Sequence, residues 1–283
     1  MEIFTPSNYK DAFTPWGYYI ADQVDQKSKM LILGKISQQE YSDLTSMTSV
    51  LAVFRDCFSI KEMLLESNSD IINYLNRLSS QVIPPDYSIV MPCLISANKF
   101  LMNYLSFFKM FIDVSSKSIK KIHKEELQEF QKYSSKLYDS LFGYRFISRL
   151  RNYAIHREMP LKNLEVSRQE GTRITCRKSE LLQYDGWSTV KKEILILPDG
   201  IDVIPYIEES QAGAIKLYIK ILEIIAQDVY RLRSYLEELY AGLNPESPII
   251  IITGGTIHEF KVDAVPVYYL NLFLKEQKRY SMS

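Results

Sequence analysis

Residues 87–116, YSIVMPCLISANKFLMNYLSFFKMFIDVSS, decide the fold class of this chain. Apolar residues recur there at steps of three and four, which is the spacing of a one-sided helical face. That face consists of Leu94, Ala97, Leu101, Tyr104, Leu105, Phe108 and Phe111. Its most apolar part, residues 89–112, contains the polar residues Asn98, Lys99, Asn103 and Lys109. It therefore falls short of the roughly 18 uninterrupted apolar residues of a membrane-spanning helix, and it predicts a buried helix of a soluble bundle.

Helical patterns continue on both sides of this stretch. They cover residues 37–58, 70–78, 124–157 and 207–243. Pro84-Pro85 ends the second segment and Pro160 ends the third, because proline cannot continue a helix. Gly143 is a candidate interruption within the third segment. The predicted fold class is mainly α, an antiparallel helical bundle.

Two regions have the composition of strands. Residues 164–167 and 173–177 flank the turn signal Glu170-Gly171, and residues 191–197 are a further strand candidate. They predict a small β excursion at about 163–206. Near the end of the chain, two apolar runs flank Gly254-Gly255, which is typical of a hairpin. The predicted division is an N-terminal arm over 1–36, a helical domain over 37–247, and a C-terminal hairpin and tail over 248–283.

Composition excludes several classes of protein. The chain has 283 residues, 46% of them apolar, which is ample for a packed core. Its 34 basic and 34 acidic residues balance, so global charge gives no support to a protein that coats nucleic acid. Three separated cysteines suggest neither a zinc site nor a disulfide framework. We expect a cytoplasmic protein with reduced thiols, no metal site and no cofactor, and we find no export or membrane segment.

The segment that suggests chemistry is YRFISRLRNYAIHREMPL, residues 144–161. No acidic residue lies between Asp139 and Glu158, so this segment is a local basic patch in a chain of zero net charge. Its polar residues follow the spacing i, i+4, i+7 and i+11, which predicts one helical face formed by Arg145, Arg149, Asn152 and His156. The opposite face is expected in the core and carries Phe146, Leu150 and Tyr153.

These residue types suit phosphate binding or phosphodiester cleavage. A guanidinium clamps a phosphate and stabilises the charge of a pentacoordinate transition state. Histidine titrates near neutrality and can transfer a proton, while asparagine can orient either group. No carboxylate cluster is adjacent, so a metal-free mechanism is the simpler hypothesis. A basic helical face that is merely solvated is the alternative interpretation of the same residues.

One helix does not by itself bring the key pair together. Arg151 and His156 are five positions apart, which is about 140° around a straight helix. Two subunits meeting at this helix would place both residue types at one phosphate.

The string Arg151-Asn152-Tyr153-Ala154-Ile155-His156 resembles the signature of the HEPN superfamily, an arginine and a polar residue followed by a histidine. The resemblance implies an all-α bundle with the motif on a late helix, and many members are metal-independent endoribonucleases whose dimers form one composite cleft. It implies Arg151 and His156 as the catalytic pair and Asn152 as the supporting polar residue. Some toxin members carry a tyrosine two positions after the histidine. Here that position is Glu158, which argues against a modification switch on that residue.

The hypothesis that results is a homodimeric endoribonuclease with an RNA substrate, acting in toxin–antitoxin control or phage defence. Arg145, Arg149 and Arg157 are expected to position phosphates. A cognate antitoxin or regulatory protein is a further expected partner. The alternatives are a non-catalytic HEPN-like module that binds RNA, a nucleotide or a protein, and a purely structural helical interaction protein.

Overall fold

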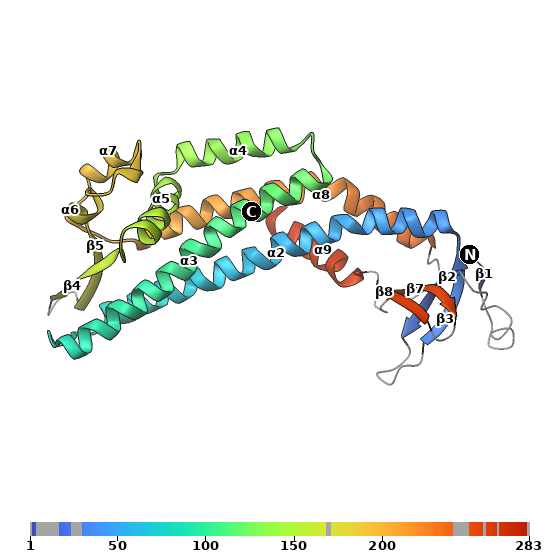
Figure 1. Cartoon of the computed structure of the whole chain (residues 1–283), viewed down its shortest axis with the longest axis horizontal. Coiled ribbons are helices and arrows are strands. Elements are labelled where there is room, and N and C mark those ends of the chain that lie inside the picture. Colours follow the sequence, from blue (N-terminus) through green and yellow to red (C-terminus); the bar gives the residue numbers. More distant parts are fainter. Residues whose placement is uncertain are drawn as a thin grey trace. The chain divides into compact units, whose positions relative to one another are not determined.

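The computed structural model describes residues 2–3, 17–23, 30–167, 171–239, 249–256, 259–264 and 266–281. The chain divides into two compact units, one of residues 1–55 with 222–283 and one of residues 56–221. Helices α2 (Gln38–Ser79) and α8 (Ile204–Leu239) each contribute residues to both units. Helices make up most of the described chain, which confirms a mainly α fold (Figure 1).

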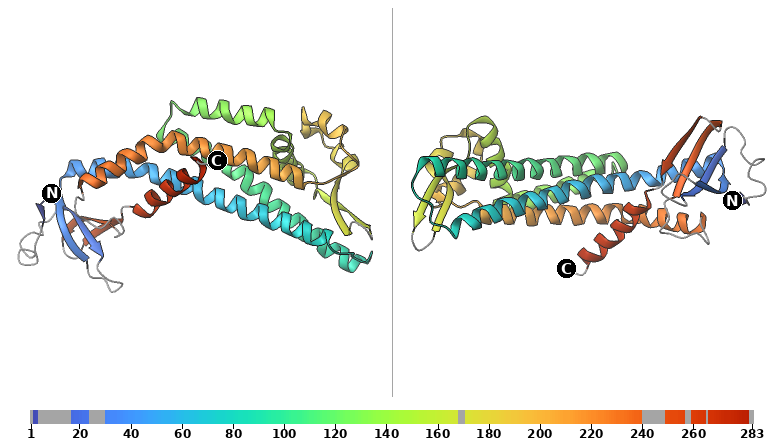
Figure 2. Two further views of the ribbon diagram at one scale, coloured as in Figure 1. Left: turned by 180° about the vertical axis from the view of Figure 1, so that it is seen from behind. Right: turned by 90° about the horizontal axis from the view of Figure 1, so that it is seen from below.

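The unit of residues 56–221 is built on long helices. Besides parts of α2 and α8 it contains α3 (Tyr87–Ile122), α4 (Leu127–Ser140) and α5 (Phe142–His156). Helices α2 and α3 lie side by side, and the Tyr74 hydroxyl donates a hydrogen bond to the Cys93 carbonyl across them (3.1 Å; Figure 2). The predicted apolar face of α3 is buried from Ala97 to Phe111, so the opening stretch forms the core of this unit as expected.

A small antiparallel sheet follows α5 in the chain. Its order is β4 (Leu161–Ser167), β5 (Gly171–Arg177) and β6 (Gly200–Ile201). Gly171 has φ = +71°, and a Cβ there would lie 1.8 Å from the Ser79 carbonyl oxygen, so this position requires glycine. Glu170, the other half of the predicted turn signal, lies outside the described residues. The two long strands confirm the β excursion after α5.

The expected strand at 191–197 is wrong. The segment forms helix α7 (Val190–Leu195). Its buried residues are Val190 and Ile194, which are four positions apart, while Ile196 is 85% exposed. Burial at a helical spacing therefore overrides a β-branched composition that suggested a strand. Two short elements, α6 (Lys178–Leu181) and η1 (Asp185–Trp187), complete this region.

Two helix boundaries also differ from expectation. Helix α2 is one continuous element of 42 residues, without a break between residues 58 and 70. The break between α4 and α5 falls at Leu141, whose backbone is extended (φ −111°, ψ 112°), and not at Gly143. Gly143 lies inside α5, where close packing against another helix explains the glycine.

The other unit holds a five-stranded sheet that joins the two ends of the chain. The order is β1 (Glu2–Ile3), β3 (Met30–Ile36), β2 (Gly17–Gln23), β7 (Ile249–Thr256) and β8 (Glu259–Ala264). Neighbouring strands β2 and β7 are antiparallel, with Tyr18 opposite Thr253. Residues 1–36 therefore contribute strands of a sheet, where an arm was expected.

The prediction that the chain ends in a hairpin and a tail is wrong. The last described element is helix α9 (Val267–Ser281), and Phe273 on it packs edge-on against Phe54 of α2 (5.4 Å between ring centroids). Strands β7 and β8 pair before it, but Gly254 lies within β7 opposite Phe260 and is not in a turn. The prediction placed a turn at Gly254-Gly255 because a glycine inside a strand resembles a turn signal in the sequence. None of the helices in the described ranges is long and apolar enough to cross a membrane.

Candidate functional site

Helix α5 carries the residues on which the sequence hypothesis depends, and a carboxylate from α8 holds its first turn. Leu141 offers no side-chain cap, and the Gly143 N–H donates instead to the Glu209 carboxylate. A Cβ at Gly143 would lie 2.6 Å from Glu209 Oε2 and 2.7 Å from the Tyr206 carbonyl oxygen. The glycine thus permits a close approach of α5 to α8, and the carboxylate satisfies an N–H of the first helical turn.

The core face of α5 is as the sequence predicts. Phe146, Leu150 and Tyr153 are buried, at 0%, 0% and 1% exposure. Phe146 and Tyr153 both stack on Trp187, with ring centroids 5.7 and 5.9 Å apart. Because these rings fix the rotation of α5 about its axis, they decide which way its polar residues face.

Arg145 does not have the environment of a phosphate-binding residue. Its Nη2 lies 2.5 Å from Glu193 Oε1 of α7, and its Nη1 donates to the carbonyls of Tyr138, at 2.9 Å, and Asp139. The side chain is 14% exposed. The guanidinium joins the last turn of α4 to α7, where it satisfies carbonyls that have no helical partner. Arg145 was expected to position a phosphate, and its guanidinium is instead occupied by protein partners.

The remaining basic residues differ in their exposure and in their hydrogen bonds to other helices. The Arg149 Nε donates to the Tyr138 hydroxyl at 3.3 Å, so this half-buried side chain is partly engaged with α4. Arg157 and His156 are exposed at the end of the helix. His156 is the last residue of α5, and the Arg157 N–H closes the helix on the Tyr153 carbonyl at 2.8 Å.

Arg151 stands out among the cations of α5. It is half-buried, and its Nε is shielded from solvent and has no hydrogen-bond partner within the described residues. The Arg151 guanidinium forms no ion pair in that part of the chain, and the side chains of Asn152 and His156 make no hydrogen bond there. Burying part of a cation without a partner costs free energy. An external anion would offset this cost.

The chain that leaves α5 is anchored on two sides. Asn98 of α3 donates to the Leu161 carbonyl at 2.7 Å and accepts from the Leu161 N–H at 3.1 Å. The Tyr153 hydroxyl donates to Glu158 at 2.7 Å, and Glu158 also pairs with Lys162. Hydrogen bonding from Lys162 and Tyr153 holds the pKa of Glu158 below its ordinary value, whereas burial and the neighbouring Glu158 raise the pKa of Tyr153.

The predicted site is thus only partly assembled in one chain. Arg151, Asn152 and His156 lie within the last six positions of α5, and Arg157 follows them. Arg151 and His156 remain about 140° apart around the helix, since α5 is continuous over both. Arg145 points its charge to α4 and α7.

Three residues that shape this region were not predicted from the sequence: Asn98, Glu193 and Glu209. Each contacts α5 or its exit from a distant position in the chain, so local spacing contains no signal for Glu193 or Glu209. Asn98 did have a signal. It is a buried amide on the apolar face of α3, and such a group requires a hydrogen-bond partner.

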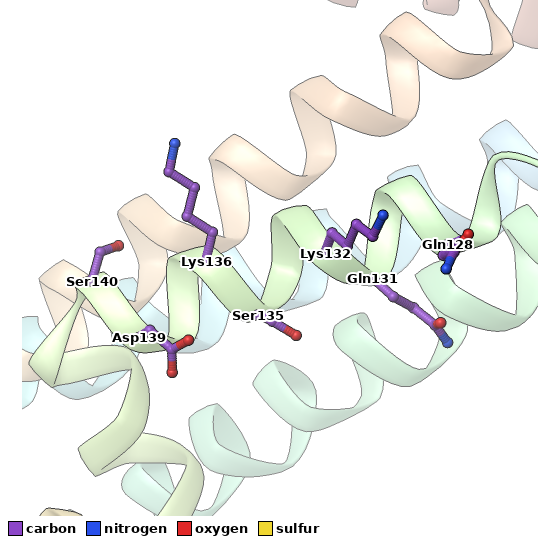
Figure 3. A pocket seen from close by; sticks show the side chains of 7 residues that line it. All are labelled: Gln128, Gln131, Lys132, Ser135, Lys136, Asp139 and Ser140. Carbon is purple, nitrogen blue, oxygen red and sulfur yellow. The ribbon is translucent and has the colours of Figure 1, made fainter.

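This unit has a surface hollow on α4, away from the predicted site residues on α5. All of its lining residues belong to α4, and Figure 3 shows Lys136 on a different side of that helix from Ser135 and Asp139. No residue of α5 lines it. Among the described residues, no group of three or more His, Cys, Asp or Glu is arranged to hold a metal ion.

No family model, no curated protein and no solved structure matches this chain.

Proposed function

We propose that the protein is a metal-independent endoribonuclease of HEPN type, acting as a homodimer in toxin–antitoxin control or phage defence. The observation that carries the proposal is the half-buried Arg151 guanidinium without an acidic partner among the described residues. Arg145, six positions earlier, has a carboxylate and two carbonyls. A half-buried cation without an ionic partner among the described residues, on the same helix as an exposed histidine, suits the binding of a phosphate.

In the proposed mechanism three side chains of α5 act on the reacting groups, and two further arginines position neighbouring phosphates. His156 removes the proton of the ribose 2′-hydroxyl and returns a proton to the leaving 5′-oxygen. The 2′-oxygen attacks the phosphorus as the bond to the 5′-oxygen breaks, which gives a 2′,3′-cyclic phosphate and a 5′-hydroxyl. Arg151 stabilises the charge on the phosphoryl oxygens. Asn152 orients the reacting groups, and Arg157, with Arg149, positions the neighbouring phosphates.

Two copies of the chain would complete the site. Arg151 and His156 of one α5 face directions about 140° apart, so a single helix does not direct both at one phosphorus. If two α5 helices meet, Arg151 of one copy can lie beside His156 of the other. The composite arrangement also doubles the local positive charge in a chain of zero net charge.

RNA cleavage by the purified chain in the presence of a chelator tests this proposal. The variants are His156→Ala and Arg151→Ala, and His123→Ala is the matched control because His123 lies outside α5 in the α3–α4 connection. We expect cleavage by the wild type and by the control, with a loss of at least ~100-fold in each site variant. Equal cleavage by all four proteins would rule out the assignment.

Mixing the two inactive variants tests the composite site. A dimer of one Arg151→Ala copy and one His156→Ala copy retains one intact arginine and one intact histidine on opposite subunits. We expect the mixture to cleave RNA although neither variant does so alone. No recovery after verified subunit exchange would contradict the composite site.

The second candidate is a non-catalytic HEPN-like module that binds RNA, a nucleotide or a protein partner through the same residues. The exposed apolar residues Ile155 and Met159 beside His156 favour it, since they suit a contact surface as well as a catalytic one. RNA that is bound by the wild type and never cut, with weaker binding by Arg151→Ala, would select this candidate over the enzyme.

A further inference from the structure

The placement of His156 depends on what holds the chain after it. His156 is the last residue of α5, and the last turn of a helix frays readily because its carbonyls lack helical partners. Met159 and Arg157 in the following connection are exposed, so apolar packing at those two residues contributes little to holding it. Pro160 in the same connection is buried, and hydrogen bonds add to its packing in fixing this segment.

Asn98 supplies such bonds from a distant helix. It is 7% exposed and lies on the otherwise apolar face of α3. Its amide donates to the Leu161 carbonyl (2.7 Å) and to the Leu94 carbonyl (2.9 Å), and its oxygen accepts from the Leu161 N–H (3.1 Å). The side chain thus pairs with both backbone groups of one residue, as a neighbouring strand would. It fixes the end of the connection at the first residue of β4.

A second link holds the beginning of the connection. The Tyr153 hydroxyl donates to Glu158 Oε1 at 2.7 Å, and Glu158 pairs with Lys162 in β4. The Tyr153 ring is held in turn by Trp187 and Tyr184, with ring centroids 5.9 and 5.7 Å away. Both ends of the connection are therefore attached to rigid elements, one through α3 and one through the aromatic cluster around Trp187.

We propose that Asn98, together with the Tyr153–Glu158 link, is a positioning device that fixes the last turn of α5 and so sets where the His156 imidazole lies relative to Arg151. The inference rests on the proposed function, since it concerns the histidine that would transfer the proton. Asn98 itself touches no substrate in this scheme. It acts through Leu161 and the four residues between Leu161 and His156.

The imidazole signals of the protein in NMR spectra test this directly. The chain has three histidines, and His156→Gln assigns the signal of interest. We expect Asn98→Ala to shift and broaden the His156 signals, while the His123 signals stay unchanged. Amide exchange at residues 157–161 should increase at least ~10-fold. Asn103→Ala is the matched control, because Asn103 is an exposed asparagine on the same helix.

The kinetic readout separates positioning from simple loss of stability. At a temperature well below unfolding, Asn98→Ala should lower kcat for RNA cleavage by ~10- to 100-fold and change KM less. Asn98→Asp keeps an acceptor for the Leu161 N–H and should recover part of kcat. Unchanged His156 signals and unchanged amide exchange in a folded Asn98→Ala protein would overturn the proposal.

Two further outcomes are decisive. If Asn98→Ala does not fold, Tyr153→Phe replaces it, because that change removes only the hydroxyl and keeps the ring on Trp187. The same His156 response is then expected, and its absence overturns the proposal. If the wild type cuts no RNA, the ribonuclease proposal fails, and the spectra and exchange rates still decide whether Asn98 positions His156.

Discussion

Arg145 and Arg151 lie six positions apart on α5 and have opposite environments. Arg145 is saturated by Glu193 and two carbonyls, whereas Arg151 has no ionic partner in the described part of the chain. The difference arises from which neighbours each side chain meets, since both are arginines on one basic helix. At the scale of the residue, the structure thus separates a cation that holds helices together from one that is available to a ligand.

Replacing Arg145 should affect stability more than RNA binding. Arg145→Ala removes charge-assisted hydrogen bonds, so we expect the free energy of unfolding in urea to fall by about 2 kcal/mol. Arg149→Ala is the control, and it should cost less than about 1 kcal/mol because only one long hydrogen bond at 3.3 Å is lost. A tenfold loss of RNA affinity in a fully stable Arg145→Ala protein would show that Arg145 binds RNA after all.

The three cysteines should differ in reactivity. Burial raises the pKa of the Cys57 thiol to about 12 and also raises the pKa of Cys176, so neither forms a thiolate readily at pH 8. Cys93 is only half-buried. We expect a thiol reagent to label Cys93 alone in the native protein and all three cysteines in urea, as read by mass spectrometry. Rapid labelling of Cys57 in the native protein would contradict the burial of this thiol.

At the scale of the element, α5 is held along its whole length. Glu209 of α8 holds its first turn, Trp187 holds its middle, and Asn98 holds the chain that leaves it. A helix of 15 residues is only marginally stable alone in water, so these tertiary contacts stabilise it. A helix held at both ends can present Arg151 and His156 in fixed directions.

Gly143→Ala tests the contact between α5 and α8. Helix propensity alone predicts a gain of about 1 kcal/mol for alanine. The close approach to Glu209 and the Tyr206 carbonyl predicts the opposite, a loss of about 1–3 kcal/mol from overpacking. Thermal unfolding distinguishes the two signs. Gly200→Ala is the control, since its nearest neighbour would be the Thr175 hydroxyl at 3.1 Å. A more stable Gly143→Ala protein would show that the helices are farther apart.

At the scale of the whole molecule, the two ends of the chain build one sheet. Strand β2 near the beginning pairs with β7 near the end, and Tyr19 lies opposite Ile252. Such a pairing closes a very long loop, which costs entropy that grows only slowly with loop length. Strands β1, β2 and β3 pair with one another within residues 2–36, so only the second edge of β2 depends on the end of the chain for its neighbour, β7.

A designed disulfide tests this register. In a background with Cys93→Ser, the pair Tyr19→Cys and Ile252→Cys should form an intramolecular disulfide on mild oxidation, because the two residues are Cα partners in the ladder. The control pair Tyr19→Cys and Ile250→Cys is two positions out of register and should remain reduced. Mass spectrometry of the digested, non-reduced protein reads the outcome. A crosslink in the control alone would show a shifted register.

Sequence by itself determined the elements whose signal is local. Apolar spacing placed α3 and its buried face, the core side of α5, and the β4–β5 pair around Gly171. Local spacing also brought Arg151, Asn152 and His156 onto one late helix. These predictions are correct because the direction of a side chain in a helix or strand follows from its position in the chain.

Only the tertiary structure decided which neighbours these elements meet. Residues 190–195 became a helix because Val190 and Ile194 are both buried in the folded unit. Arg145 was taken up by Glu193, Asn98 was bonded to Leu161, and β2 was paired with β7, across separations that no local pattern records. The physical reason is that a hydrogen bond or ion pair needs two partners, and the chain fixes only one of them at each position.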